Sequence, residues 1–494
     1  MKTFWLLYLL SGLLLFSCSE KNTEAGVEQK PNILFIAIDD LRPELGCYGN
    51  EHIKSPNIDK LASQGFLFKN HFVNVPTCGA SRHCLLTGQL PVSKAHIKNS
   101  ITSLTTSLQA EQEIPETFIH HLKRNGYYTV GIGKITHHPD GYVYGYLEPK
   151  SEQLELPHSW NEMLNEDEKW GSGHNAFFGY SNGTNRNTLN KEVKPYEMAD
   201  VPDEGYIDGL NANLAIKKLG ELKEKGQPFF LGVGFFKPHL PFTAPKKYWD
   251  MYNEEELPLS PTPFIPENVN VASLHGSGEF NQYKLGEEKA SLKSPVSDEY
   301  ARKMRHAYFA CVSYIDAQVG KLIAELENQG LAENTIVVVW GDHGWHLGDQ
   351  LVWGKHTVFE RALKSAFIIK LPGNSNGKTI DKVVSTTDIY PTLMELCGTP
   401  VNHSLDGTSL TGLMKNPEDK NWRNTAYSYF RNGISVRTDR YRMSKFFRKE
   451  KPVIELYDHK NNADESTNIA AEKPEIVKQL MPVLEKGNTG LYSL

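Results

Sequence analysis

The run Asn32-Ile-Leu-Phe-Ile-Ala-Ile-Asp39-Asp40 is apolar through its centre and ends in two carboxylates. Such a run is typical of a strand that is buried on both faces, as the strands of parallel sheets are. Thr335-Ile-Val-Val-Val-Trp-Gly-Asp342-His343-Gly344 repeats the design far downstream and ends in an Asp-His pair. Ligands of open α/β sheets collect at the carboxyl ends of the strands, so the two runs predict a buried sheet with a polar site along that edge.

The rest of the chain alternates strand-like and helix-like segments, which indicates an α/β fold with helices on both faces of a parallel-centred sheet. The other expected strands are 127–133, 228–236 and 366–371, and the expected helices are 58–65, 115–125, 208–225, 298–329 and 387–397. Further on, short strands are expected at 426–430, 433–437, 441–447 and 454–457, followed by a helix at 473–485. The segment 151–204 lacks clear periodicity, so we expect loops there that carry specificity, and 257–295 is Pro-rich and irregular.

The segment Cys78-Gly-Ala-Ser-Arg82-His83-Cys84-Leu-Leu-Thr-Gly88 combines a possible nucleophile, an arginine and a helix start. A helix N-terminus offers unpaired N–H groups and a partial positive charge to an anion. Arg82 adds a planar fork of donors that matches oxygen atoms. A lone cysteine is most often a small buried residue, but the whole pattern favours a reactive one.

This segment resembles the signature of the formylglycine-dependent type I sulfatases, a Cys or Ser followed by any residue, Pro or Ala, Ser, Arg and later Leu-Thr-Gly. The resemblance implies that Cys78 is oxidised to formylglycine (3-oxoalanine), whose hydrated aldehyde attacks sulfur. Such covalent catalysis divides one difficult step into two easier ones. Ala80 stands where many relatives have Pro, which leaves open which formylglycine-generating maturation enzyme acts on the chain.

The resemblance also implies a fold, that of the alkaline phosphatase-like superfamily. We expect a large central mixed, mostly parallel sheet flanked by helices, plus a smaller C-terminal domain with an antiparallel sheet and a helix. Residues 31–412 would form the catalytic sulfatase domain and residues 413–494 the C-terminal subdomain.

A metal site follows from the same resemblance. In this family Asp39, Asp40, Asp342 and His343 would be ligands of one divalent cation, and the modified Cys78 and a sulfate oxygen would complete the shell. Oxygen ligands favour Ca²⁺ or Mg²⁺ over softer metals, so we expect Ca²⁺, with Mg²⁺ as the alternative. Either acidic pair alone would usually be a solvated strand end or a helix cap.

Three further segments supply the cations of the expected site. Gly133-Lys134-Ile-Thr-His137 resembles the element whose Lys holds sulfate and whose His steadies the nucleophile's hydroxyl. Lys237-Pro-His239-Leu-Pro-Phe242 places a histidine where the family binds sulfate or protonates the leaving group, and Trp353-Gly-Lys355-His356 matches an element whose Lys binds sulfate. Cations placed in advance lower the barrier to sulfuryl transfer. The expected catalytic residues are Cys78, Arg82, Lys134, His137, His239 and Lys355.

Within the family the chain is most similar to the iduronate-2-sulfatase branch, through Asp39-Asp-Leu-Arg-Pro-Glu-Leu-Gly-Cys-Tyr-Gly49, Ser55-Pro-Asn-Ile-Asp-Lys-Leu-Ala62 and Asp342-His-Gly-Trp-His-Leu-Gly348. The implied substrate is the 2-sulfate of iduronate in a glycosaminoglycan, and a sulfated algal polysaccharide such as ulvan or carrageenan is the alternative. The run Phe359–Phe367 departs from the turn that relatives carry near the pocket, which leaves the sugar open. The expected substrate contacts are His83, Lys237, Trp345 and His346.

Two other functions stay open on the sequence. A phosphodiesterase or phosphonate hydrolase of the same superfamily would use a similar set of residues, and some of these enzymes also carry formylglycine. A catalytically dead, glycan-binding surface lipoprotein would keep the scaffold, although the intact Cys, Arg, Lys, His and metal positions argue against it.

The amino terminus predicts a lipoprotein-type signal peptide at 1–18, in which Lys2 precedes the apolar run Phe4–Phe16 and Cys18 would carry the lipid. Residues 19–30 would form a polar tether. The expected location is therefore the periplasm or the cell surface of a bacterium, with membrane contact only through the lipid anchor. A secretory signal without lipid is the alternative.

Charge gives a limited guide to partners. The formal net charge of −6 provides no long-range attraction for a sulfated polysaccharide, so binding must rely on a local basic pocket. No basic run or aromatic-basic pattern indicates nucleic-acid binding. The expected partners are the sulfated saccharide and the maturation enzyme.

Overall fold

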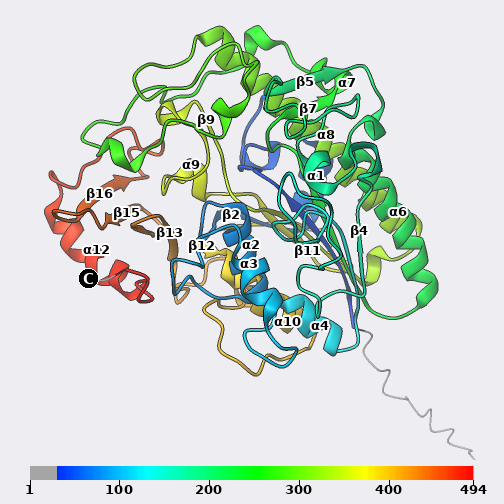
Figure 1. Ribbon diagram of the computed structural model, residues 1–494. Coiled ribbons are helices and arrows are strands. Elements are labelled where there is room, and N and C mark those ends of the chain that lie inside the picture. The colour runs from blue at the N-terminus through cyan, green and yellow to red at the C-terminus, as the bar shows by residue number, and fades with distance from the viewer. Residues whose placement is uncertain (1–29, 493–494) are drawn as a thin grey trace, which may run out of the picture.

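The computed structural model describes residues 30–492 (Figure 1). The predicted signal peptide with its Cys18, and the tether up to residue 29, lie outside the described residues. Within the described part, no helix is both long enough and apolar enough to cross a membrane. The molecule is built on a central sheet with helices on both faces, and a smaller sheet lies at one flank.

An eight-stranded sheet in the order β12-β2-β11-β8-β1-β6-β3-β4 forms the centre of the molecule. Neighbouring strands pair in parallel except at β11, which is antiparallel to both β8 and β2. The expected mixed, mostly parallel sheet is therefore confirmed. The strands are β1 (Asn32–Ile38), β2 (Phe66–Phe72), β3 (Tyr128–Gly133), β4 (Glu162–Leu164), β6 (Phe229–Phe235), β8 (Thr335–Gly341), β11 (Phe367–Lys370) and β12 (Lys378–Ser385).

Helices cover both faces of this sheet, as the side chains of β1 show. Leu34 and Ile36 pack with residues of α1, α6 and α8 on one face, whereas Ile33 and Phe35 pack with α2, α4 and α10 on the other. Successive side chains of a strand point to opposite faces, so a strand that is apolar at every position is buried between two layers. The helices are α1 (Pro56–Gln64), α2 (Cys78–Thr87), α4 (Phe118–Arg124), α6 (Ile207–Lys225), α8 (Asp298–Asn328) and α10 (Ile389–Leu396).

Three strands of the central sheet, β2, β4 and β12, were not expected from the sequence. Strand β4 has only 3 residues and lies within the segment 151–204, where loops were expected. In β2 the polar residues Lys69, Asn70 and His71 interrupt the apolar run. Strand β12 lies at the edge of the sheet and begins with the exposed Lys378 and Thr379. Edge strands are half solvated, so their sequences lack the continuous apolar pattern of central strands.

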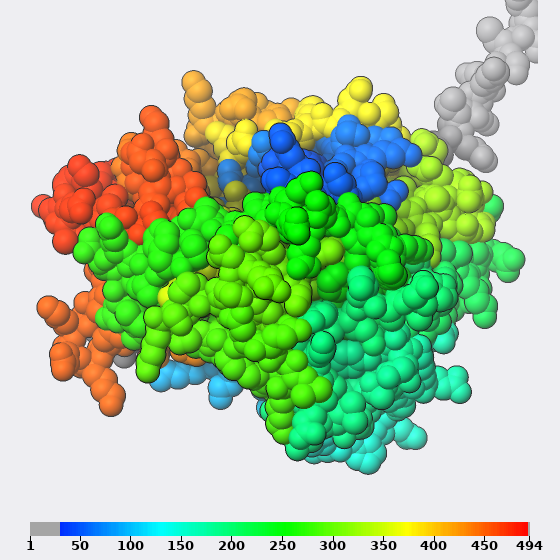
Figure 2. All heavy atoms as spheres, turned by 90° about the horizontal axis from the view of Figure 1, so that it is seen from above, coloured from blue at the N-terminus to red at the C-terminus, as the bar shows by residue number. Residues whose placement is uncertain are grey.

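A four-stranded antiparallel sheet in the order β13-β14-β15-β16 follows, with α12 packed against it, which confirms the expected C-terminal architecture. The backbone N–H of Tyr429 donates to the carbonyl of Asn74 at 2.7 Å, which joins this sheet to the chain after β2. In Figures 1 and 2 this carboxyl-terminal part (orange to red) lies at one flank of the molecule. The elements are β13 (Ala426–Phe430), β14 (Gly433–Arg437), β15 (Tyr441–Phe446), β16 (Val453–Asp458) and α12 (Pro474–Lys486).

The two irregular segments of the sequence form long connections with short elements. Both contribute walls to a cavity at the carboxyl edge of the central sheet. Residues 257–295 carry only 3-10 turns. The short elements of the chain are α3 (Ile101–Leu104), α5 (Gly173–Phe177), β5 (Tyr196–Ala199), β7 (Phe242–Pro245), α7 (Lys246–Trp249), β9 (His346–Leu347), β10 (Trp353–Gly354), α9 (Glu360–Leu363) and α11 (Thr411–Lys415).

His71 on β2 makes the stability of this fold sensitive to acid. The ring is fully buried between the hydroxyls of Ser365 and Thr386, each 3.0 Å from a ring nitrogen, and burial lowers the pKa of His71 to about 3. The unfolded chain binds this proton near pH 6.5, whereas the folded chain does not. The free energy of unfolding should therefore fall as the pH drops from about 6.5 toward 3, by roughly 2 kcal/mol at pH 5 from this residue alone.

Urea denaturation at pH 7.5 and pH 5 measures this loss. In His71→Gln the loss between the two pH values should be smaller by about 2 kcal/mol, because the substituted residue does not titrate. The exposed His52 provides the control His52→Gln. An equal pH dependence in the unsubstituted protein and His71→Gln would contradict the prediction.

Candidate active site

The carboxyl ends of β1 and β8 bring two pairs of polar residues together. The backbone N–H of Asp342 donates to the carbonyl of Ile38 at 3.2 Å, and the N–H of Asp40 donates to Oδ1 of Asp342 at 3.0 Å. Asp40 has a φ of 60°, a left-handed conformation that takes the chain off the end of the strand. Asp39, Asp40, Asp342 and His343 are all completely buried. The two neighbouring strands thus end in one compact polar cluster.

Helix α2 points its first residue at this cluster. Nε2 of His343 lies 3.2 Å from Sγ of Cys78. The ligand atoms of Asp39, Asp40, Cys78 and His343 all lie within 4.8 Å of one another. Gly79 follows the cysteine, and a Cβ there would lie 2.2 Å from the carbonyl oxygen of Asn99. The close approach of two backbones therefore holds the start of α2 in place.

Three cations balance the buried carboxylates. Lys134 pairs with Oδ2 of Asp39, and Nζ of Lys355 lies 3.0 Å from Oδ1 of Asp40. The guanidinium of Arg82 binds Oδ2 of Asp342 through Nε at 3.0 Å and Nη2 at 2.9 Å. Arg82 also donates to the backbone carbonyls of Lys134 and Ile135. Each carboxylate therefore has its own positive partner.

These partners and the depth of burial shift the pKa values of the cluster. Burial alone would raise the pKa of Asp39, but Lys134 and Arg82 hold it well below its usual range. Burial raises the pKa of Asp40 well above its usual range, although Lys355 opposes the shift. Burial, with the charge of Asp39, raises the pKa of the Cys78 thiol to about 12. An unmodified Cys78 is therefore a neutral thiol at physiological pH.

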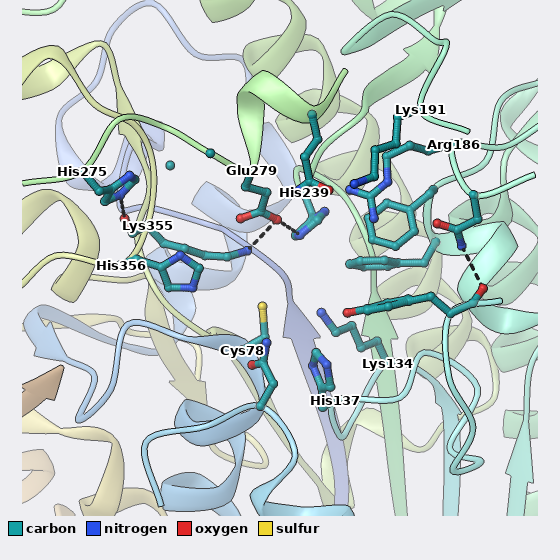
Figure 3. Close-up of a pocket in the computed structure, with 18 of the residues that line it drawn as sticks. Cys78, Lys134, His137, Arg186, Lys191, His239, His275, Glu279, Lys355 and His356 are labelled. Carbon is teal, nitrogen blue, oxygen red and sulfur yellow. Dashed lines mark hydrogen bonds and ion pairs between the residues drawn. The ribbon is translucent and has the colours of Figure 1, made fainter. Parts of the chain in front are cut away.

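A cavity of about 750 Å³ opens above Cys78 (Figure 3). Lys134 and His137 lie on one side of the sulfur in this view, and Lys355 and His356 on the other. The lining of this cavity is mainly basic, because Glu279 is the only carboxylate among its lining residues in the described chain. The basic and histidine residues that line it are Lys134, His137, Arg186, Lys191, His239, His275, Lys355, His356 and Arg431.

The half-buried ring of His137 and the buried ring of His239 both face this cavity. Burial, with Lys134 close by, lowers the pKa of His137 well below its usual range, and its Nδ1 is buried without a hydrogen-bond partner in the described chain. Nδ1 of His239 lies 2.6 Å from the carbonyl of Leu240, and Nε2 lies 2.9 Å from Oε1 of Glu279. Burial and Lys355 lower the pKa of His239 to about 3.

The sulfatase family model matches residues 31–399, which is most of the chain. The chain belongs to the sulfatase family. A second model, that of the N-sulphoglucosamine sulphohydrolase C-terminal region, matches residues 341–489. This sulfatase is therefore a sulfuric ester hydrolase, and its family acts on sulfated sugars among other esters of sulfate.

Sequence and structure relatives agree with the family. Iduronate 2-sulfatase of Mus musculus is 32% identical over 410 residues, which cover 75% of this chain and 69% of that protein. A solved structure of a protein in complex with its substrate D-glucosamine-2-N,6-O-disulfate has a TM-score of 0.70 at 21% identity and covers 94% of this chain and 98% of its own. Phosphonate monoester hydrolase from Silicibacter pomeroyi has a TM-score of 0.71 at 22% identity, with 94% and 97% covered. Both structures support the alkaline phosphatase-like fold.

Five of the six residues predicted as catalytic line the cavity of this sulfatase: Cys78, Lys134, His137, His239 and Lys355. Arg82 does not line it, because its guanidinium lies beneath the floor among the carboxylates. Asp342 likewise lies beside the group formed by the other predicted metal ligands, with Oδ2 held by Arg82.

None of the four predicted substrate contacts lines this cavity. His83 bonds to the hydroxyl of Thr106 at 2.9 Å, and Nζ of Lys237 donates to the carbonyl of Pro241 at 2.7 Å. Trp345 is completely buried under Lys355, and His346 is held by Thr357. These side chains are used inside the protein, because each is buried and makes its contacts within the fold.

The cavity walls hold residues that the motifs did not predict. Glu279 and His275 come from the Pro-rich segment 257–295, and Arg186 and Lys191 come from the segment expected to form specificity loops. Irregular segments carry no periodic signal, so a sequence can indicate that such a loop matters without indicating which side chains it turns inward.

Proposed function

We propose that this sulfatase removes a sulfate ester from a sugar of an anionic poly- or oligosaccharide, with residue 78 as formylglycine hydrate beside one divalent cation. The observation that carries the proposal is the place of Cys78, which lies at the start of α2, at the floor of a basic cavity and in contact with a buried carboxylate cluster. Anions enter such a cavity because its cations replace their hydration.

Asp39, Asp40, His343 and residue 78 have a donor set that fits a hard divalent cation. Oδ1 of Asp39 is buried without a hydrogen-bond partner among the described residues, so a ligand position is free. Carboxylate oxygens favour Ca²⁺, with Mg²⁺ as the alternative, and Asp342 would complete the set from the same edge. When bound, the cation would polarise a sulfate oxygen and acidify the attacking hydroxyl.

Residue 78 would act only after maturation. With its pKa raised to about 12, the thiol is a poor nucleophile at neutral pH. Its Sγ marks the place of the hydroxyl oxygens of the formylglycine hydrate. The hydrate supplies two hydroxyl groups, one to attack sulfur and one to lose its proton so that sulfate leaves.

The two lysines of the cavity and Arg82 would have different electrostatic roles. Lys134 and Lys355 line the cavity and keep their charge, because carboxylate partners raise the pKa of each against the effect of burial. Their ammonium groups would hold sulfate oxygens as negative charge develops. Arg82, held by Asp342 under the floor, would keep the carboxylates in place rather than bind sulfate.

The two histidines would move protons. The neutral ring of His137, with its buried unpartnered Nδ1, would accept the proton of the second hydroxyl. The charge of a bound sulfate would raise the pKa of His239, which would then protonate the departing sugar oxygen. Its neighbour Glu279 at 2.9 Å favours the same protonated form.

Cys78→Ala should abolish sulfate release, because an alanine at this position cannot be oxidised to the aldehyde that forms the hydrate. The matched control is Cys84→Ala, a buried cysteine of the same helix, which should keep most of the activity. The rate of sulfate release is measured on a 2-sulfated iduronate disaccharide and on ulvan and carrageenan oligosaccharides. The saccharide that loses its sulfate fastest identifies the sugar. Turnover by Cys78→Ala, or faster cleavage of phosphate diesters and phosphonates than of every sulfate, would contradict the proposal.

His239→Gln should lose activity selectively. General-acid catalysis contributes roughly 10²- to 10⁴-fold when the leaving group is basic, as a sugar oxygen is. A nitrophenyl oxygen leaves without protonation, so 4-nitrophenyl sulfate should be cleaved with a much smaller loss. An equal loss of kcat on the sugar sulfate and the aryl sulfate would show that His239 does not donate the proton.

A further inference from the structure

The described chain buries six arginines, and five of them have a carboxylate within 4.0 Å. Those five are Arg42, Arg82, Arg305, Arg437 and Arg442. Arg186 is the exception: it is 7% exposed and has no carboxylate partner among residues 30–492. Buried guanidinium groups are costly unless they are paired. This arginine therefore differs from every other buried arginine of the described chain.

Its surroundings explain how the protein tolerates the charge. The guanidinium lies 3.4 Å from the ring centre of Phe178 and 5.6 Å from that of Tyr283. Aromatic faces attract cations, but by less than a carboxylate does. Nε of Arg186 is buried without a hydrogen-bond partner in the described chain. The arginine thus keeps donor capacity that no protein group uses.

The backbone holds this arginine firmly at the cavity wall. Its N–H donates to the carbonyl of Phe178 at 3.1 Å, and its own carbonyl accepts from the N–H of Lys191 at 2.8 Å. A bridge between Gly179 and Asn185 closes the hairpin that leads to it. Figure 3 shows Arg186 and Lys191 side by side, on the far side of His239 from Lys355. The arginine is therefore placed in advance rather than carried on a free loop.

We propose that Arg186 is a second anion site within the cavity, which binds a second negatively charged group, a carboxylate or a further sulfate, of the same substrate. The aromatic rings of Phe177 and Phe178 separate it from Lys134, whose Nζ lies 4.3 Å from the ring centre of Phe177. The cavity thus has a cationic floor for the sulfate that is removed and a cationic wall for a group that stays. The inference rests on the proposed function, because it names the class of substrate for that same cavity.

Lys191 supports this site from the solvent side. It lines the cavity, is exposed and has no carboxylate partner in the described part of the chain. The attraction of an exposed lysine for an anion is modest because salt screens it. The charge of a buried arginine is screened much less, and its planar fork fixes the direction of its hydrogen bonds. Arg186 therefore sets selectivity, and Lys191 adds a weaker attraction.

The test measures binding to Cys78→Ala protein by calorimetry, so that no substrate is turned over. The probes are a 2-sulfated iduronate disaccharide, the same disaccharide with its carboxylate reduced to an alcohol, and carrageenan oligosaccharides with one and with two sulfates. Arg186→Met should weaken the binding of the carboxylate probe or of the doubly sulfated probe roughly 10- to 100-fold. The binding of the matched probe that lacks the second charge should weaken by less than about 3-fold. Arg186→Lys should recover part of the loss, and Arg124→Met, at a surface position, is the charge-matched control.

Loss on the carboxylate probe identifies a uronate, and loss on the doubly sulfated probe identifies a second sulfate. Equal weakening of every probe, no weakening, or no binding of any probe by the parent protein would overturn the proposal. Thermal unfolding of each variant separates loss of the site from loss of the fold. Sulfate release by the unsubstituted protein, measured in parallel, tests the proposed function alone. Binding that depends on Arg186 without sulfate release would contradict the proposed function and still support the anion site at Arg186.

Discussion

Three carboxylates and a histidine are buried side by side where β1 and β8 end, and the rest of the site depends on balancing this negative charge. Like charges repel strongly in a low-dielectric interior, so each carboxylate needs a cation beside it. The cations come from three separate parts of the chain, Arg82 on α2, Lys134 after β3 and Lys355 after β10. The parallel sheet is what brings these segments to one edge, and α2 is fixed there by its contact with Asn99.

The same arrangement separates the negative charges from the positive ones. Carboxylates lie under the floor of the cavity, and cations line its floor and walls. A cation held by the carboxylates and a sulfate held in the cavity would each lie beside groups of the opposite charge. Glu279 is the exception in the wall, and its charge is balanced by Lys355, whose Nζ lies 3.5 Å from Oε1. Net charge is therefore a poor guide to this protein, since the overall −6 coexists with a basic cavity.

The central strands were predictable because continuous apolar runs that end in Asp-Asp or Asp-His have few structural interpretations. Strands β2 and β12 were missed, since polar residues such as Asn70 and Thr379 replace the apolar pattern toward the edge of the sheet. Strand β4 was missed because its 3 residues are too few to show a period. The motifs located Cys78 and its cations because each motif sits on or next to a regular element. Glu279 and Arg186 could not be located, because their side chains are aimed by irregular loops whose contacts are set by the whole fold.

The most direct test of this account is the metal content of the purified protein, measured by elemental analysis after removal of loosely bound ions, together with sulfate release. The account predicts one divalent cation per chain, lost in Asp39→Asn together with the activity and retained in Cys84→Ala. A protein that releases sulfate at full rate with no bound cation, or an Asp39→Asn variant that keeps both ion and activity, would contradict the central claim that the buried carboxylates form a cation site for the nucleophile.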